Sequence, residues 1–211
     1  MIQTKSNRRA ISVDELLKTK FKMMAFDGEF KESFGTPEMS GSWLIWGNSA
    51  NGKTRFTLQL SKYLTKFGKV AYNSLEEGAK LSFKRAIQQT GMISVAKRFI
   101  ILKGESIEQL KERLTKQKSP NIIIIDSVQY TDLDKKGYKN LINQFPTKLF
   151  IFISHADGKK PLGSTAVAIQ YDSDVKVFVQ GYKAFVRSRF GGNKPFIIWE
   201  EGAMDYWKDK N

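Results

Sequence analysis

An eight-residue stretch constrains this chain most, because it fits the pattern G-x-x-x-x-G-K-[ST] and lies between an apolar run and an amphipathic stretch. It runs through Gly47, Asn48, Ser49, Ala50, Asn51, Gly52, Lys53 and Thr54. Glycines allow main-chain N–H groups and a helix N-terminus to face phosphate groups. We expect Lys53 to reach the β- and γ-phosphates and Thr54 to ligate Mg²⁺. A glycine-rich turn with a capping threonine is the alternative. The predicted nucleotide-binding set is these eight residues and the adjacent Arg55.

Apolar and amphipathic stretches alternate along the chain around this loop. We expect strands over 42–46, 69–74, 99–102, 121–126 and 149–154, and helices over 53–66, 79–89 and around 107–114. The run 121–126 is too apolar to have an exposed face, which is typical of a parallel sheet. Strands over 175–179, 184–189 and 196–199, without helices between them, predict antiparallel hairpins. The predicted fold class is α/β, with a mostly parallel sheet, helices on both faces and a C-terminal hairpin region.

The first forty residues precede this pattern. Ser12 and Glu15 have the spacing of a capping box, and the apolar residues that follow have helical spacing, so we predict a short amphipathic helix over 13–24. This helix would pack on its own core or dock on a neighbouring copy. With 211 residues, the chain suits one domain with short extensions. We expect an N-terminal extension over 1–40, a core over 41–200 and a tail over 201–211.

The charge balance indicates the kind of partner. The chain has 35 Lys and Arg against 21 Asp and Glu, a net charge of +14, which favours nucleic acid first and anionic lipid second. It has no cysteine and one histidine, which excludes thiol catalysis and Cys-ligated zinc. The longest apolar run, 149–153, is far shorter than the roughly 20 residues that span a bilayer. We therefore expect no membrane span and a cytoplasmic location.

Acidic side chains follow two of the predicted strands. Asp126 ends an isoleucine run, where ligands of open α/β sheets collect, and would hold Mg²⁺. Glu76 and Glu77 follow the strand 69–74, close to where a γ-phosphate would lie, so that one of them is a candidate base that orients water. The alternatives are a turn-capping aspartate and an acidic helix N-terminus, and the second applies more to Glu77 than to Glu76.

The combination of these motifs resembles the RecA superfamily, specifically the ATPase cores of bacterial RadA-type recombination proteins and DnaB-type helicases. Tyr72-Asn-Ser-Leu-Glu76-Glu77 is similar to the segment that carries the family's catalytic glutamate, which favours Glu76. Ile124-Ile-Asp126-Ser-Val-Gln129 resembles the family's Walker B segment, "I-D-S-I-Q". The resemblance covers about residues 41–200, and Tyr171-Asp-Ser-Asp174-Val resembles the entry to the next strand.

A loop after the strand 149–154 also resembles this family. Ser154 and His155, followed by Lys159 and Lys160, are similar to RadA's "G-H-V-T-K", and Ser164 and Thr165 follow in the next loop. The resemblance implies that Ser154 and His155 sense the γ-phosphate and that the four later residues bind DNA. A hydrogen-bonded structural histidine and a solvated basic loop are the alternatives.

Two arginines complete the resemblance. Arg187-Ser-Arg189-Phe-Gly191 looks like RadA's "K-N-R-F-G", which implies that Arg189, with Arg187 as the second candidate, stabilises charge at a neighbouring subunit's nucleotide. A solvent-facing strand edge is the alternative. The chain departs from RadA in three ways: Arg187 replaces a lysine, the loop after His155 is a residue shorter, and the zinc and protease-like domains are absent.

The expected function is a DNA-dependent ATPase of the RecA/RadA type in recombination, repair or replication. Its expected ligands are ATP and Mg²⁺, and its expected partners are DNA, single-stranded by resemblance, and further copies of itself in a ring or filament. A regulatory or assembly ATPase with a protein or membrane partner is the alternative. A small-molecule kinase shares the phosphate loop, but the strand-rich last third predicts no arginine-bearing helical lid.

Overall fold

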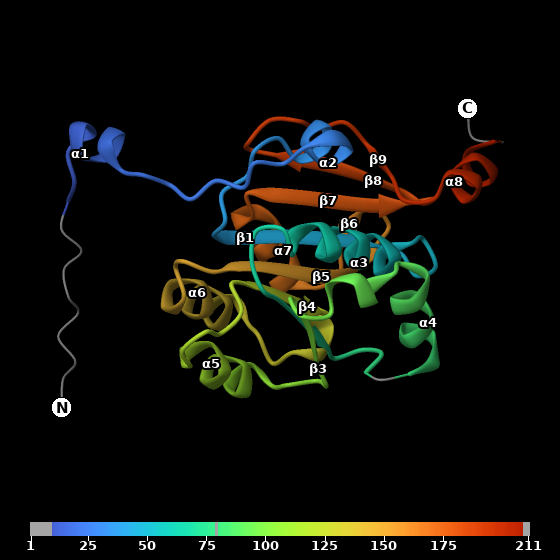
Figure 1. Ribbon diagram of the computed structural model, residues 1–211, viewed down its shortest axis with the longest axis horizontal. Helices are drawn as coiled ribbons and strands as arrows, with labels where there is room; N and C mark the ends of the chain where they lie inside the picture. The colour runs from blue at the N-terminus through green and yellow to red at the C-terminus, as the bar shows by residue number, and fades with distance from the viewer. Residues whose placement is uncertain (1–9, 79, 209–211) are drawn as a thin grey trace.

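One central sheet organises the chain. A computed structural model describes residues 10–78 and 80–208, and its main strand order is β3-β2-β4-β5-β1-β7-β8-β9 (Figure 1). The strands are β1 (Gly41–Gly47), β2 (Val70–Ser74), β3 (Phe99–Leu102), β4 (Ile122–Asp126), β5 (Leu149–Asp157), β6 (Lys160–Pro161), β7 (Val175–Gln180), β8 (Lys183–Ser188) and β9 (Phe196–Ile197). The pairs from β3 to β7 are parallel, β8 and β9 are antiparallel, and β6 pairs antiparallel with β5. The predicted fold class is confirmed.

Helices cover both faces of the sheet. The helices are α1 (Val13–Lys18), α2 (Gly28–Phe34), α3 (Lys53–Leu64), α4 (Leu81–Gln89), α5 (Ile107–Thr115), α6 (Lys135–Gln144), α7 (Ser164–Asp172) and α8 (Glu200–Trp207), with short 3-10 turns at Met92–Val95 and Val128–Tyr130. Buried side chains of α2, α3 and α4 pack on one face, and those of α5, α6 and α7 on the other. In the described part of the chain, every helix is too short or too polar to cross a bilayer.

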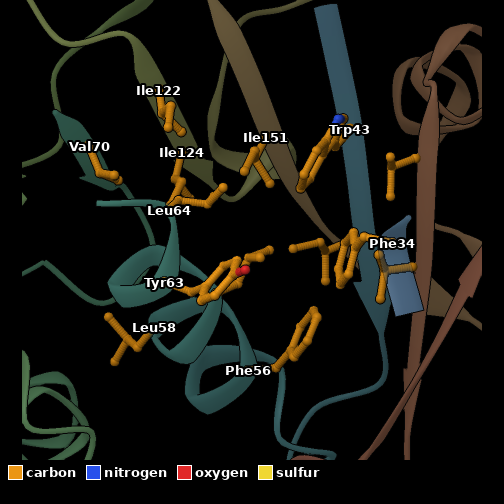
Figure 2. Packing of buried hydrophobic residues seen from close by; sticks show 14 of the residues in the cluster. Phe34, Trp43, Phe56, Leu58, Tyr63, Leu64, Val70, Ile122, Ile124 and Ile151 are labelled. Atoms are coloured by element: carbon orange, nitrogen blue, oxygen red, sulfur yellow. The ribbon is translucent and has the colours of Figure 1, made fainter. Parts of the chain in front are cut away.

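The core on the α3 face is rich in aromatic side chains (Figure 2). Trp43 and Phe34 lie with ring centroids 5.4 Å apart, and Phe56 is fully buried beside them. Strand β4 is buried along its whole length because parallel strands between two helical layers have no solvent-facing side. Its Ile122 and Ile124 face this core, while Ile123 and Ile125 face the α5–α7 layer. The sheet therefore holds its C-terminal strand edge rigidly.

The N-terminal helix is shorter than predicted. The capping box at Ser12 and Glu15 is present, but α1 ends at Lys18 and not at Met24. Lys18, Lys20 and Lys22 interrupt the apolar pattern there, and Met24 instead donates its N–H to the carbonyl of Pro37. None of the residues of α1 is buried, and the helix lies apart from the sheet (Figure 1).

Four helices were not predicted, and the expectation of no helix in the last third is wrong. Helices α2 and α6 have short apolar patterns, whereas α7 is apolar on all sides and α8 contains bulky aromatic residues that also suit strands. Helix α8 extends to Trp207, within the stretch predicted as a tail. Phe26 and Phe34, from the predicted extension over 1–40, are buried in the core.

Candidate functional site

Four parallel strands bring the predicted site residues to one edge of the sheet. Gly47 at the end of β1 is in register with His155 of β5, and Ser74 at the end of β2 is in register with Asp126 of β4. Because the C-terminal ends of parallel strands meet at one edge, segments far apart in sequence become neighbours there.

The phosphate-binding loop follows β1 and ends in α3, as its sequence predicts. A Cβ at Gly47 would lie 2.2 Å from the carbonyl oxygen of Val179, so the strand tolerates only glycine at this point. Ala50 has φ 60°, and Gly52, with φ 95°, precedes the first turn of α3. Residues with φ above zero alternate with ordinary ones here and turn successive N–H groups inward, which makes a nest for an anion.

A cavity of about 260 Å³ opens beside this loop. Its lining contains ten of the predicted site residues, namely Ser49, Ala50, Gly52, Lys53, Thr54, Arg55, Glu76, Glu77, Asp126 and His155. The Lys53 Nζ atom donates to the carbonyl of Asn48, 2.9 Å away in the same loop. Burial lowers the pKa of Lys53, and the carboxylates of Glu76 and Asp126 oppose this effect.

Asp126 is the most buried acid of the cavity. Burial raises its pKa to about 6, Glu76 and Glu77 add to that rise, and a hydrogen bond from the Tyr72 hydroxyl to Oδ2 opposes it. Its main-chain carbonyl accepts from the N–H groups of Leu75 and Glu76, 2.7 and 3.1 Å away. These bonds fix the chain after β2 against the end of β4, so that Glu76 and Asp126 are placed together.

The two adjacent glutamates have different partners. One carboxylate oxygen of Glu76 lies 3.4 Å from Nε2 of His155, across the cavity on β5. Glu77 accepts weakly from the Thr54 hydroxyl at 3.5 Å and from Ser82 at 2.9 Å. Glu77 is therefore tied to the first turns of α3 and α4, whereas Glu76 faces a histidine from another strand.

The oxygen donors of the cavity suit a hard cation. Thr54 and Asp126 offer a hydroxyl and a carboxylate, the donor types that Mg²⁺ prefers. Among the described residues, no group of three or more His, Cys, Asp and Glu could hold a metal ion by itself. The residues thus fit a cation that takes the rest of its ligands from phosphate and water.

Some predicted residues lie outside this cavity. Ser154 is fully buried and accepts from the amide of Gln129 at 2.9 Å. Asn51 accepts at Oδ1 from the N–H of Gly181 at 2.8 Å, which ties the phosphate loop to the β7–β8 turn. The Thr165 hydroxyl donates to the Leu133 carbonyl at 3.0 Å near the start of α7, next to Ser164.

The basic residues of the resemblance are spread over two further places. Lys159 and Lys160 lie exposed at the β5–β6 turn. Arg189 pairs with Asp174 at 3.3 Å, and Arg187 lines a separate hollow on the sheet. None of these four contacts the phosphate loop within the described chain, so a role at a nucleotide would require a second copy for the arginines.

Three side-chain contributions were missed by sequence reasoning. Besides Ser154, Gln129 accepts from the N–H of His155 at 3.2 Å and donates to the carbonyl of Leu162 at 2.8 Å, and so links the ends of β4 and β5 to the next loop. Tyr72 binds Asp126. An adjoining cavity of about 740 Å³ beside Ser49 and Ala50 is walled by aromatic residues, namely Tyr182, Trp199 and Tyr206. The apolar patterns suggested only packing for these rings.

Comparison with known proteins shows the fold. No protein-family model matches the chain, and no curated protein matches it in sequence. Among solved structures, the ATPase domain of a DnaB-type helicase is similar with a TM-score of 0.56 and 18% identity, over 78% of this chain and 84% of that one. The flagellar accessory protein FlaH from Methanocaldococcus jannaschii is similar with a TM-score of 0.58 and 12% identity, over 80% and 88%. The chain thus has the fold of a RecA-like P-loop ATPase core.

Proposed function

We propose that this RecA-like protein hydrolyses ATP and couples hydrolysis to binding of single-stranded DNA, in recombination, repair or replication. The observation that carries the proposal is the meeting of Lys53, Thr54, Glu76 and Asp126 in one cavity at the C-terminal edge of the sheet. A cation for the phosphates, oxygen ligands for Mg²⁺ and a carboxylate base are the parts that phosphoryl transfer requires.

Each residue has a defined role in this proposal. The N–H groups of 47–54 bind the phosphates, and Lys53 exchanges its bond to Asn48 for a phosphate oxygen. Mg²⁺, held by Thr54 and Asp126, neutralises phosphate charge when it is bound with ATP. Glu76 orients a water molecule and accepts its proton, and His155 holds the Glu76 carboxylate and responds to its movement. Arg55, whose guanidinium lies 5.5 Å from the Trp199 ring, borders the cavity where the base would lie.

Coupling to DNA would use the loop after His155. The carbonyl of His155 accepts from the N–H of Leu162 at 2.9 Å, and Gln129 joins both residues, so a shift of His155 moves the turn that carries Lys159 and Lys160. Ser164 and Thr165 follow that turn. In a ring or filament, Arg189 and Arg187 would reach the nucleotide of the adjacent copy and stabilise charge on the transferred phosphoryl group. The net charge of +14 supports a polyanionic partner.

The affinity for a labelled oligothymidylate tests the coupling. We expect it to differ at least about fivefold between protein saturated with a non-hydrolysable ATP analogue and protein saturated with ADP, because linkage between two ligands is typically of that size or larger. We also expect the logarithm of the affinity to fall linearly with the logarithm of salt concentration. Equal affinities in both nucleotide states would contradict the proposed coupling.

An assembly ATPase with a protein or membrane partner is the second candidate. The similarity to a flagellar accessory protein supports it, because a RecA-like fold serves that protein as well. The same titration separates the two: hydrolysis that depends on Lys53, without DNA affinity at low salt, would favour this second candidate.

A further inference from the structure

A second hollow lies on the sheet, away from the phosphate loop. Val175, Val177 and Val179 of β7 point into the core on the α2–α3 face, so alternate residues of β7 point to the opposite face. That face is covered by α7 at β1, but at β7 and β8 it forms a hollow of about 650 Å³. Five aromatic residues, three cations and two glutamines line it, with no carboxylate among the described lining residues.

The β7–β8 register arranges these side chains in matched pairs. Phe178 lies opposite Phe185, and Lys176 lies opposite Arg187. The two phenylalanine rings are stacked with centroids 6.5 Å apart. Like charges opposite one another destabilise an antiparallel pair. Neither Lys176 nor Arg187 forms an ion pair with another described residue, so this cation pair is arranged to attract an anion and adds no stability of its own.

Further rings extend the aromatic pair on both sides. The ring of Trp46 lies 5.7 Å from that of Phe178, and the ring of Trp207 lies 6.0 Å from that of Phe185. Lys183 stands over the Trp207 ring at 5.3 Å. Rings flanked by cations are the arrangement with which proteins hold unpaired bases and the phosphates between them. A duplex hides its base faces and would leave these rings without a partner.

The hollow is connected to the nucleotide cavity. Trp46 precedes Gly47, where β1 enters the phosphate loop, and its Nε1 donates to the carbonyl of Lys159 at 3.0 Å. The turn between β7 and β8 donates two hydrogen bonds to Asn51 of the loop, from Gly181 at 2.8 Å and from Tyr182 at 3.2 Å. A ligand that moves this hairpin would therefore act directly on the loop that holds phosphate.

We propose that this hollow, lined by Trp46, Lys176, Phe178, Phe185 and Arg187, binds single-stranded nucleic acid. Bases stack on Phe178 and Phe185, and phosphates lie at Lys176 and Arg187. The inference deepens the proposed function and rests on it, because it provides a binding site in addition to the loop of Lys159 and Lys160.

Binding of a labelled oligothymidylate without nucleotide tests the proposal. The double substitution Lys176→Gln and Arg187→Gln should weaken binding at least about tenfold at low salt and reduce the slope of log affinity against log salt by about 1.4, the value expected for two phosphate contacts. The matched control is Lys84→Gln with Arg85→Gln. It removes the same charges from exposed positions of α4, on the other layer, and should bind nearly as the wild type does.

A second variant tests the rings alone. Phe178→Leu with Phe185→Leu keeps an apolar surface but removes the stacking platform, and should weaken binding about tenfold with an unchanged salt slope. Thermal melting followed by circular dichroism shows whether this variant is folded. If it is not, the charge variant, which relieves a repulsion, carries the test.

The outcomes separate this inference from the proposed function. Wild-type binding together with hollow variants that bind as tightly as the α4 control would overturn the inference and leave the proposed function standing. Variants that lose self-association but keep their oligonucleotide affinity would assign the hollow to a subunit contact and would also overturn it. No binding of oligothymidylate by the wild type at low salt would contradict both.

Discussion

Asp126 shows how a single residue is set between stability and function. The apolar strand β4 delivers it, 7% exposed, to the edge of the sheet, and burial raises its pKa to about 6. The sequence predicted its position, because an acid at the end of an isoleucine run has few other places to lie. Its hydrogen bond from Tyr72 was not predictable, since the tyrosine is also a normal core residue of β2 and only the register of β2 with β4 brings the two together.

The raised pKa predicts a pH-dependent cost to the metal-free protein. A carboxyl group whose folded pKa of about 6 exceeds its unfolded value of 3.8 destabilises the fold when it is ionised, and this loss sets in as the pH rises through that interval. A difference of this size corresponds to about 3 kcal/mol. Asp126→Asn should therefore raise the free energy of unfolding above pH 6, and the gain should shrink toward pH 4. Urea unfolding without Mg²⁺ measures it, and a gain that grows toward pH 4 would refute the assignment.

The neighbouring glutamates form a natural matched pair. Glu76 faces His155, whereas Glu77 is bound to Thr54 and Ser82, so the proposal gives only Glu76 the role of base. Glu76→Gln should reduce the rate of ATP hydrolysis at least about 100-fold, and Glu77→Gln less than about tenfold. A phosphate-release assay at saturating ATP measures both rates. The opposite ranking would move the base to Glu77.

At the scale of elements, the strands were more predictable than the helices. Continuous apolar runs indicated β1, β2, β3, β4 and β5, because strands buried on both sides need no other pattern. Helix α7 escaped prediction because it is nearly uniformly apolar, and α8 because its aromatic residues have no clear period of 3.6. The hydrogen bonds between Asn51 and the β7–β8 turn were equally hidden, since they join segments 130 positions apart.

The hairpin β7–β8 predicts an effect on stability that is separate from binding. Arg187→Gln removes one member of the repulsive pair with Lys176 and should raise the free energy of unfolding by about 0.5 kcal/mol at low salt. The gain should vanish at high salt, where exposed charges are screened. Arg85→Gln in α4 is the control and should change little. Chemical denaturation at two ionic strengths measures the effect, and a destabilised Arg187→Gln protein would show that Arg187 has an attractive partner.

At the scale of the whole molecule, composition indicated a polyanionic partner but not the surface that would meet it. The net charge of +14 is distributed by the fold, and only the β7–β8 register showed that two of these cations face one another beside stacked rings. Similarly, the helix α1 was predicted, but its exposed Val13 and Leu17 show that it leaves the core uncovered by its apolar side. Such arrangements depend on contacts distant in sequence, which local patterns do not contain.

The measurement that tests the account most directly is the steady-state rate of ATP hydrolysis with Mg²⁺, in the presence and absence of single-stranded DNA, for the wild type and for Lys53→Ala. The account predicts hydrolysis that single-stranded DNA stimulates and that Lys53→Ala abolishes, because Lys53 lies in the cavity with Glu76 and Asp126. A Lys53→Ala protein that hydrolyses ATP at the wild-type rate would contradict the assigned site. A rate that depends on Lys53 but not on DNA would contradict the coupling.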